Sequence, residues 1–135
     1  MKQQEDTFLI SYQTKGKLPG LPFVELKNDI LGPDYVLSVA CVSKKTAESL
    51  NKTYRDKDYT PNILSFPLNK KLGELVLHLP TIKKQFASFE MSHNGYILYL
   101  FIHGCLHLLG HDHGKKMDDL ETVYKNKYKK YLIAK

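Results

Sequence analysis

The stretch GYILYLFIHGCLHLLG, residues 95–110, decides the fold because it is apolar on nearly every side. Its apolar residues are too continuous for the single apolar stripe of a surface helix, so we expect a helix buried against a sheet. The stretch is shorter than the roughly 20 apolar residues that cross a bilayer. His103 and His107 interrupt it, and a buried helix needs a reason to carry imidazoles.

The segments around this helix predict a small sheet covered by helices. Alternating or β-branched apolar runs predict strands, and apolar residues at helical spacing predict helices. Pro67 lacks a backbone N–H, so its strand is expected at a sheet edge or strand end. This order of elements is typical of an α+β fold with mixed α/β layers, built here as one domain over residues 1–135. The predicted strands are 6–13, 35–43, 63–68 and 73–79, and the predicted helices are 21–31, a helix capped by Ser43, 81–90, 95–110 and a last helical segment with its apolar face from Met117 to Tyr131.

The composition is that of a globular domain with a basic surface. The chain has 135 residues, of which 42% are hydrophobic and 25% charged, and its formal net charge is +6. A positive surface favours polyanionic partners such as nucleic acid, although a solvated lysine-rich surface is the alternative. Arg55 is the only arginine among twenty basic residues. We therefore favour a specific role for its planar, bidentate guanidinium over the alternative that this arginine is present by chance.

The residue pattern predicts a cytoplasmic protein without membrane segments. The first ten residues, MKQQEDTFLI, contain acids and lack the apolar core of a secretory signal. The longest apolar run, residues 96–102, is too short to span a bilayer. Cys41 and Cys105 allow at most one disulfide, and a cytosolic setting favours free thiols.

The histidines of the buried helix have the spacing of metal ligands. His103 and His107 fall on one helix face, about 6 Å apart along the axis. His113 would lie about 15 Å beyond His103 on a continued helix, so the chain must turn first. Gly110 can take the left-handed conformation that ends the helix and brings His113 back. The sequence therefore predicts one zinc ion per chain, held by His103, His107 and His113, with a fourth position open.

The same offsets occur in the zinc-peptidase pattern H-E-x-x-H-x-x-G-x-x-H, but the general base of a peptidase is missing. Gly104 stands where that glutamate is required, which makes a metallopeptidase-like hydrolase a remote alternative. Gly104 either lets another element or a substrate approach the metal face closely, or eases helix packing. Core histidines bonded to backbone carbonyls would explain one of the three histidines and poorly explain all three.

HGCLHLLGHDH, residues 103–113, is similar to the signature H-G-x-L-H-L-x-G-x-D-H. LNKTYRDKDYTPNILSFP, residues 50–67, resembles the block L-N-x-x-Y-R-x-K-D-x-P-T-D-V-L-S-F-P, and residues 72–86 resemble an L-G-D-I segment and the helix that follows it. Through these three segments the chain resembles the YbeY family of bacterial endoribonucleases, which act in ribosomal RNA maturation. The resemblance implies a mixed sheet of about four strands packed with helices, and a metal-dependent endoribonuclease domain.

Carried over position by position, the resemblance makes the three histidines metal ligands and Arg55 the arginine of the active cleft. Asn62 and Glu74 stand where the family usually has aspartate, and His111 where an aromatic residue is common. These departures leave the roles of the three positions open. His111 is a spare imidazole that can transfer protons, replace His113 as a ligand, or lie in a solvated loop.

The residue types fit phosphodiester chemistry. Zinc can lower the pKa of bound water and polarise a phosphoryl oxygen, and Arg55 can stabilise the negative charge that builds during displacement. Asp112 either orients a metal ligand or caps the helix that starts near Lys115. No residue stands out as a general base, and the sequence leaves both water and the RNA 2′-hydroxyl as nucleophiles.

Two classes of function fit these observations. We expect a single-strand-specific, zinc-dependent endoribonuclease in small-subunit ribosomal RNA processing and ribosome quality control, with ribosomal or assembly proteins as further partners. The alternative is a non-catalytic assembly factor that binds ribosomal RNA through its lysines and uses zinc only to stabilise its fold. A structural zinc site normally closes with a fourth protein ligand. The motif offers none at a suitable spacing, which favours the enzyme.

Overall fold

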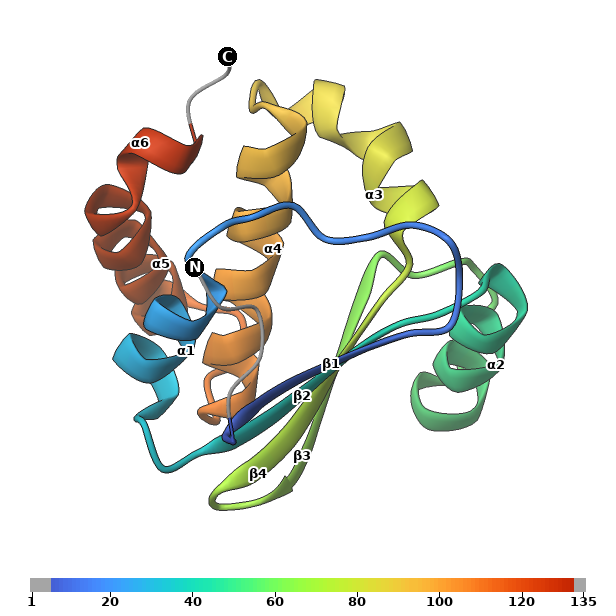
Figure 1. The fold of residues 1–135 in the computed structure, drawn as a ribbon, viewed down its shortest axis with the longest axis horizontal. Coiled ribbons are helices and arrows are strands. Elements are labelled where there is room, and N and C mark those ends of the chain that lie inside the picture. The colour runs from blue at the N-terminus through green and yellow to red at the C-terminus, as the bar shows by residue number, and fades with distance from the viewer. Residues whose placement is uncertain (1–5, 133–135) are drawn as a thin grey trace.

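A computed structural model describes residues 6–132, in which a four-stranded sheet lies between two layers of helices (Figure 1). Residues 1–5 and 133–135 lie outside the described residues. The first five of the ten residues from which we predicted that a secretory signal is lacking are among them. The strands are β1 (Phe8–Tyr12), β2 (Val36–Cys41), β3 (Ile63–Asn69) and β4 (Leu72–Leu77). The helices are α1 (Phe23–Leu31), α2 (Lys44–Arg55), α3 (Leu79–Gln85), the 3-10 turn η1 (Phe86–Phe89), α4 (His93–Leu108), α5 (Lys115–Lys127) and α6 (Lys129–Leu132).

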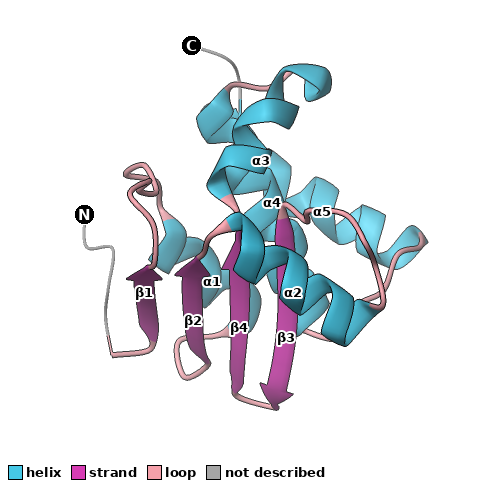
Figure 2. Ribbon diagram, turned by 90° about the vertical axis from the view of Figure 1, so that its right-hand side faces the viewer, coloured by secondary structure: helices cyan, strands magenta, loops and turns pink. Residues whose placement is uncertain are grey.

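The sheet is mixed, with strand order β1-β2-β4-β3. β1 pairs with β2 and β2 with β4 in parallel, whereas β3 runs antiparallel to β4 and forms an edge (Figure 2). Pro67 lies in β3, next to a register irregularity. The predicted α+β class, the four strands and the edge position of Pro67 are therefore confirmed.

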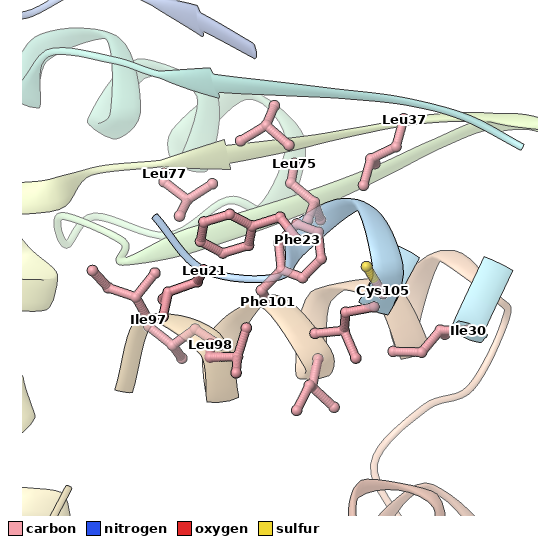
Figure 3. Packing of buried hydrophobic residues seen from close by; sticks show 14 of the residues in the cluster. Leu21, Phe23, Ile30, Leu37, Leu75, Leu77, Ile97, Leu98, Phe101 and Cys105 are labelled. Atoms are coloured by element: carbon pink, nitrogen blue, oxygen red, sulfur yellow. The ribbon is translucent and has the colours of Figure 1, made fainter. Parts of the chain in front are cut away.

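The main core lies between the sheet and α4. The Phe101 ring meets the Phe8 ring edge to face, with their centroids 6.1 Å apart. It meets the Phe23 ring in the same way at 5.0 Å, a pair labelled in Figure 3. Leu75 and Cys105 are also fully buried in this cluster. Each large apolar side chain buried in this way contributes about 1.5–3 kcal/mol relative to exposure, so α4 is fixed on the sheet along its length. A smaller cluster on the other face packs against α2.

Two predicted helices are wrong in their extent. The helix predicted over residues 81–90 begins earlier, at Leu79, and ends at Gln85, after which the chain tightens into η1. This turn brings the Phe89 ring onto Tyr96 of α4, and Glu90 then takes a left-handed conformation with φ 55°. The predicted last helical segment is divided at Tyr128, which ends α5 before α6 begins.

None of the helices described within residues 6–132 is long and apolar enough to cross a membrane.

The end of α5 is fastened to α1 by the Asp29 carboxylate. Lys127 Nζ lies 2.6 Å from Asp29 Oδ2, and the Tyr128 hydroxyl donates to the same oxygen. Burial raises the pKa of Asp29, but the hydrogen bonds from Lys127 and Tyr128 outweigh it and hold the pKa below its usual 3.8. The contact therefore stabilises the fold above that pH and is lost as the carboxyl becomes protonated.

We expect Tyr128→Phe to lower the free energy of unfolding by about 1.5 kcal/mol at pH 7, because it removes one hydrogen bond to a carboxylate. The loss should shrink as the pH falls through the lowered pKa of Asp29. Urea unfolding at pH 7 and near pH 3 measures both. Tyr131→Phe is the control, since the Tyr131 hydroxyl makes no hydrogen bond within the described residues. An equal loss at both pH values would contradict the role of Asp29.

Candidate metal centre

The turn at the end of α4 brings His113 back to the helix. Ser92 caps the start of α4 by accepting from the Gly95 N–H at 2.9 Å, and the helix ends at Leu108. Gly110 then takes φ 105°, a conformation that L side chains rarely adopt. The predicted role of Gly110 is therefore confirmed, and the chain that follows places His113 beside the two helical histidines.

The three imidazoles form a nearly equilateral cluster. The ring centroid of His103 lies 4.6 Å from that of His107 and 5.1 Å from that of His113, and the other two rings are also 5.1 Å apart. One ligand atom from each residue can be chosen so that all lie within 4.8 Å of one another. His103 Nε2 and His107 Nε2 are 3.1 Å apart. Two nitrogens on a tetrahedral zinc lie about 3.3 Å apart, so the cluster could hold a metal ion.

The surroundings of His107 favour the neutral form that binds metals. Burial lowers the pKa of His107 from 6.5, and the neighbouring His103 and His113 lower it further. A hydrogen bond with the backbone of His111 and the charge of Asp112 oppose this in part. The cluster of ligand atoms contains His113 and does not contain His111.

Glu121 of α5 is a site residue that the sequence analysis missed. Its carboxylate accepts a hydrogen bond from Nδ1 of His103, and only 8% of the residue is exposed. With Nδ1 held as the donor, Nε2 of His103 keeps its lone pair for the cluster. Glu121 lies four residues after Met117 on the apolar face of α5. A carboxylate on an apolar helix face was the signal available in the sequence.

We expect Glu121→Gln to weaken metal binding about 10- to 100-fold, because residues that orient a ligand histidine contribute by that amount. Titration with zinc against a competing chelator measures this affinity. Glu121→Ala should weaken it at least as much. Asp119→Asn is the matched control, since Asp119 is an exposed acid on the same helix that pairs with Lys115. Unchanged zinc affinity in folded Glu121→Gln would show that His103 needs no such partner.

The histidine cluster opens into a cleft of about 610 Å³. The C-terminal end of α2 contributes Arg55, and α4 contributes His103 and His107. Arg55 is exposed, and its Nη1 donates to Oδ1 of Asn51 at 3.3 Å. Asn51 is fully buried and donates in turn to the Tyr59 carbonyl at 2.9 Å. No carboxylate within residues 6–132 pairs with Arg55, so its other donors are available to an anion in the cleft.

Two of the three positions that depart from the family pattern can be located relative to the histidine cluster. Asn62 lines the cleft, and its Nδ2 donates to Gln85 Oε1 at 2.9 Å, which connects the residue just before β3 to the end of α3. Glu74 lies away from the cluster, because Gly73 and Leu75 contact α4 and side chains alternate along a strand.

Gly104 and Asp112 complete the predicted site residues. A Cβ at Gly104 would lie 2.9 Å from Leu75 Cδ2 and 3.0 Å from Ile63 Cδ1, so Gly104 lets α4 pack closely on the sheet. Asp112 is exposed and lines the cleft. It does not cap α5, because the N-cap position is Gly114.

Comparisons with known proteins agree with the geometry. The family model described as "Endoribonuclease YbeY" matches residues 21–132. Proteins named "Endoribonuclease YbeY" from Stutzerimonas stutzeri and Pseudomonas putida are 34% and 35% identical over 109 residues, which are 75% of this chain and 66% and 68% of theirs. One from Helicobacter pylori is 37% identical over 91 residues, 64% of each chain. The match therefore spans about two-thirds of these relatives. A solution structure from Thermotoga maritima superposes with a TM-score of 0.58 at 25% identity and covers 90% of this chain and 92% of that one.

Proposed function

Because the chain belongs to the YbeY family of endoribonucleases, we propose that it cleaves single-stranded RNA, with zinc as its metal and ribosomal small-subunit RNA as its substrate in the cytoplasm. The observation that carries the proposal is the cleft itself. It holds an open cluster of three histidines and, in the same cavity, Arg55, which pairs with no carboxylate among the described residues 6–132.

His103, His107 and His113 would hold the zinc ion. When bound, zinc would polarise a phosphoryl oxygen and lower the pKa of a water molecule. The cluster fits the metal because its ligand atoms converge. In addition, Nδ1 of His103, which faces away from the cluster, already donates a hydrogen bond to Glu121. A structural zinc would be enclosed by a fourth protein ligand. These three histidines line an accessible cleft instead, which supports a catalytic role.

Arg55 and Asp112 are the further residues that we assign to the reaction. The guanidinium can bind a non-bridging phosphate oxygen through two N–H groups and stabilise charge that develops there. Asn51 restrains it through Nη1, which aims the remaining donors. Asp112 lies in the cleft next in sequence to His113, and we assign it to the orientation of the ligands.

The charge of the chain supports an RNA substrate. The formal net charge of +6 attracts phosphate backbones, and an open cleft suits an unpaired strand. Ribosomal or assembly proteins are the further partners that we propose, on the resemblance to the family.

A single experiment tests the function. Purified protein is analysed for metal and incubated with a labelled single-stranded RNA and with its duplex, before and after treatment with a chelator. We expect about one zinc per chain and cleavage of the single strand that stops with the chelator and returns with added zinc. RNA binding with bound zinc and no cleavage would favour the non-catalytic assembly factor instead.

A further inference from the structure

A row of aromatic rings runs from the lip of the cleft to the histidine cluster. Phe89 of η1 stacks on Tyr96 of α4, with centroids 4.7 Å apart and ring planes 19° from parallel. Tyr96 is followed by Tyr99 at 6.3 Å and 22°, and Tyr99 by His103 at 6.2 Å. All four residues line the same cleft.

The inner rings of this row are fixed in place. Tyr96 is 2% exposed, and its hydroxyl donates to Gln85 Oε1 at 3.1 Å and lies 3.4 Å from Asn62 Nδ2. Tyr99 is partly buried and has Lys125 Nζ over its ring, 5.3 Å from the centroid. The outermost ring of the row therefore stacks on a tyrosine whose position is fixed by burial and hydrogen bonds.

Phe89 is the outermost ring, and it is 48% exposed. One face of its ring lies on Tyr96, so the opposite face is not covered by that ring. Glu90 follows in a left-handed conformation with φ 55°, at the point where the chain turns from η1 toward α4. An apolar ring held flat on a buried tyrosine in a polar cleft is a surface on which another flat ring can stack.

From this arrangement we propose that Phe89 is a stacking platform for one unpaired base of the RNA, next to the metal site. The proposal rests on the proposed function, because it takes RNA as the substrate. A base is the occupant that fits, since the platform shares its cleft with Arg55 and the histidines that would act on the same strand. Lys83 and Lys84, in the last turn of α3 just before η1, supply positive charge for the adjoining phosphates.

The platform gives a physical reason for single-strand preference. Bases in a duplex are stacked on each other and cannot offer a face to Phe89, whereas unpaired bases can. Stacking of this kind tolerates any base, so it should contribute to affinity without reading sequence.

The test uses the absence of tryptophan from the chain. Phe89→Trp places a single fluorescent ring on the platform, and Tyr54→Trp places one on an exposed aromatic position of α2 outside the cleft. With metal-free protein, so that nothing is cleaved, we expect single-stranded RNA to quench the emission of Phe89→Trp and duplex RNA of the same length to leave it unchanged. The emission of Tyr54→Trp should change with neither.

Binding of the same RNA by Phe89→Leu completes the test, because leucine keeps an apolar side chain and removes the flat ring. We expect affinity about 10-fold below wild type. If Phe89→Leu does not fold, the quenching of Phe89→Trp decides alone. Wild type that cleaves RNA, with no quenching in Phe89→Trp, would overturn the platform and leave the proposed function intact. Specific quenching without any cleavage by zinc-loaded wild type would support the platform and overturn the proposed nuclease. Absence of RNA binding would overturn both.

Discussion

His107→Ala is expected to lose its metal and, with it, essentially all cleavage of RNA. The substitution leaves His103 and His113, of which one is on a helix and the other on the exposed turn after Gly110. Removing a residue that only orients a ligand already costs about 10- to 100-fold in affinity, so removing a ligand should cost at least 100-fold. Metal analysis after dialysis against a weak chelator measures the loss.

His111→Ala is the control for this substitution, because it removes an imidazole from the same turn. The ligand atoms of the cluster come from His103, His107 and His113, so His111→Ala should keep its zinc. Circular dichroism checks that both variants are folded. Full zinc occupancy in folded His107→Ala would reject this ligand, and loss of zinc from His111→Ala would move the third ligand from His113 to His111.

The clustering of His103, His107 and His113 could be predicted from the sequence because it is local. The spacing of His103 and His107 and the glycine at position 110 lie within one helix and its turn, where backbone geometry alone sets the positions. The buried helix over residues 95–110 was equally accessible, since a helix that is apolar all round must be covered on nearly every side. These are the parts of the site that the structure bears out.

The contacts that hold the site together were not accessible in the same way. Glu121 reaches His103 from α5, and Asn51 holds both Arg55 and the loop at Tyr59. Each contact depends on how elements pack, which spacing along the chain does not contain. Lys27 is a further case: a lysine within the apolar pattern of α1 is fully buried because Thr7, Asn28 and two backbone carbonyls accept from it.

The break of the helix predicted over residues 81–90 has the same origin. Its sequence has helical spacing to the end, and nothing local requires the change to η1 after Gln85. The tighter turn is explained by the contact of Phe89 with Tyr96, a residue of the next helix. Local preference was overridden there by a tertiary contact, at a position that lines the cleft.

Arg55→Lys is expected to bind RNA nearly as well as wild type and to cleave it at least about 100-fold more slowly. If Arg55 only supplied positive charge, the change would be nearly silent, because the many lysines of the chain already provide that field. Lysine cannot donate two parallel N–H bonds to one phosphate. The lysine side chain also has only one nitrogen, whereas Arg55 can contact Asn51 with one nitrogen and a phosphate with the others. An ammonium that keeps the contact with Asn51 is therefore held away from the substrate.

Single-turnover cleavage by zinc-loaded protein separates these two roles, because it measures the chemical step apart from binding and product release. Lys52→Arg is the matched control: Lys52 lies on α2 close to Arg55, is exposed and pairs with Asp56 and Asp58. That variant should cleave at the wild-type rate. Equal zinc content and equal RNA affinity in Arg55→Lys, with a slow cleavage step, would place the guanidinium at the reacting phosphate. A cleavage rate near that of wild type would leave Arg55 as one more positive charge on the rim of the cleft.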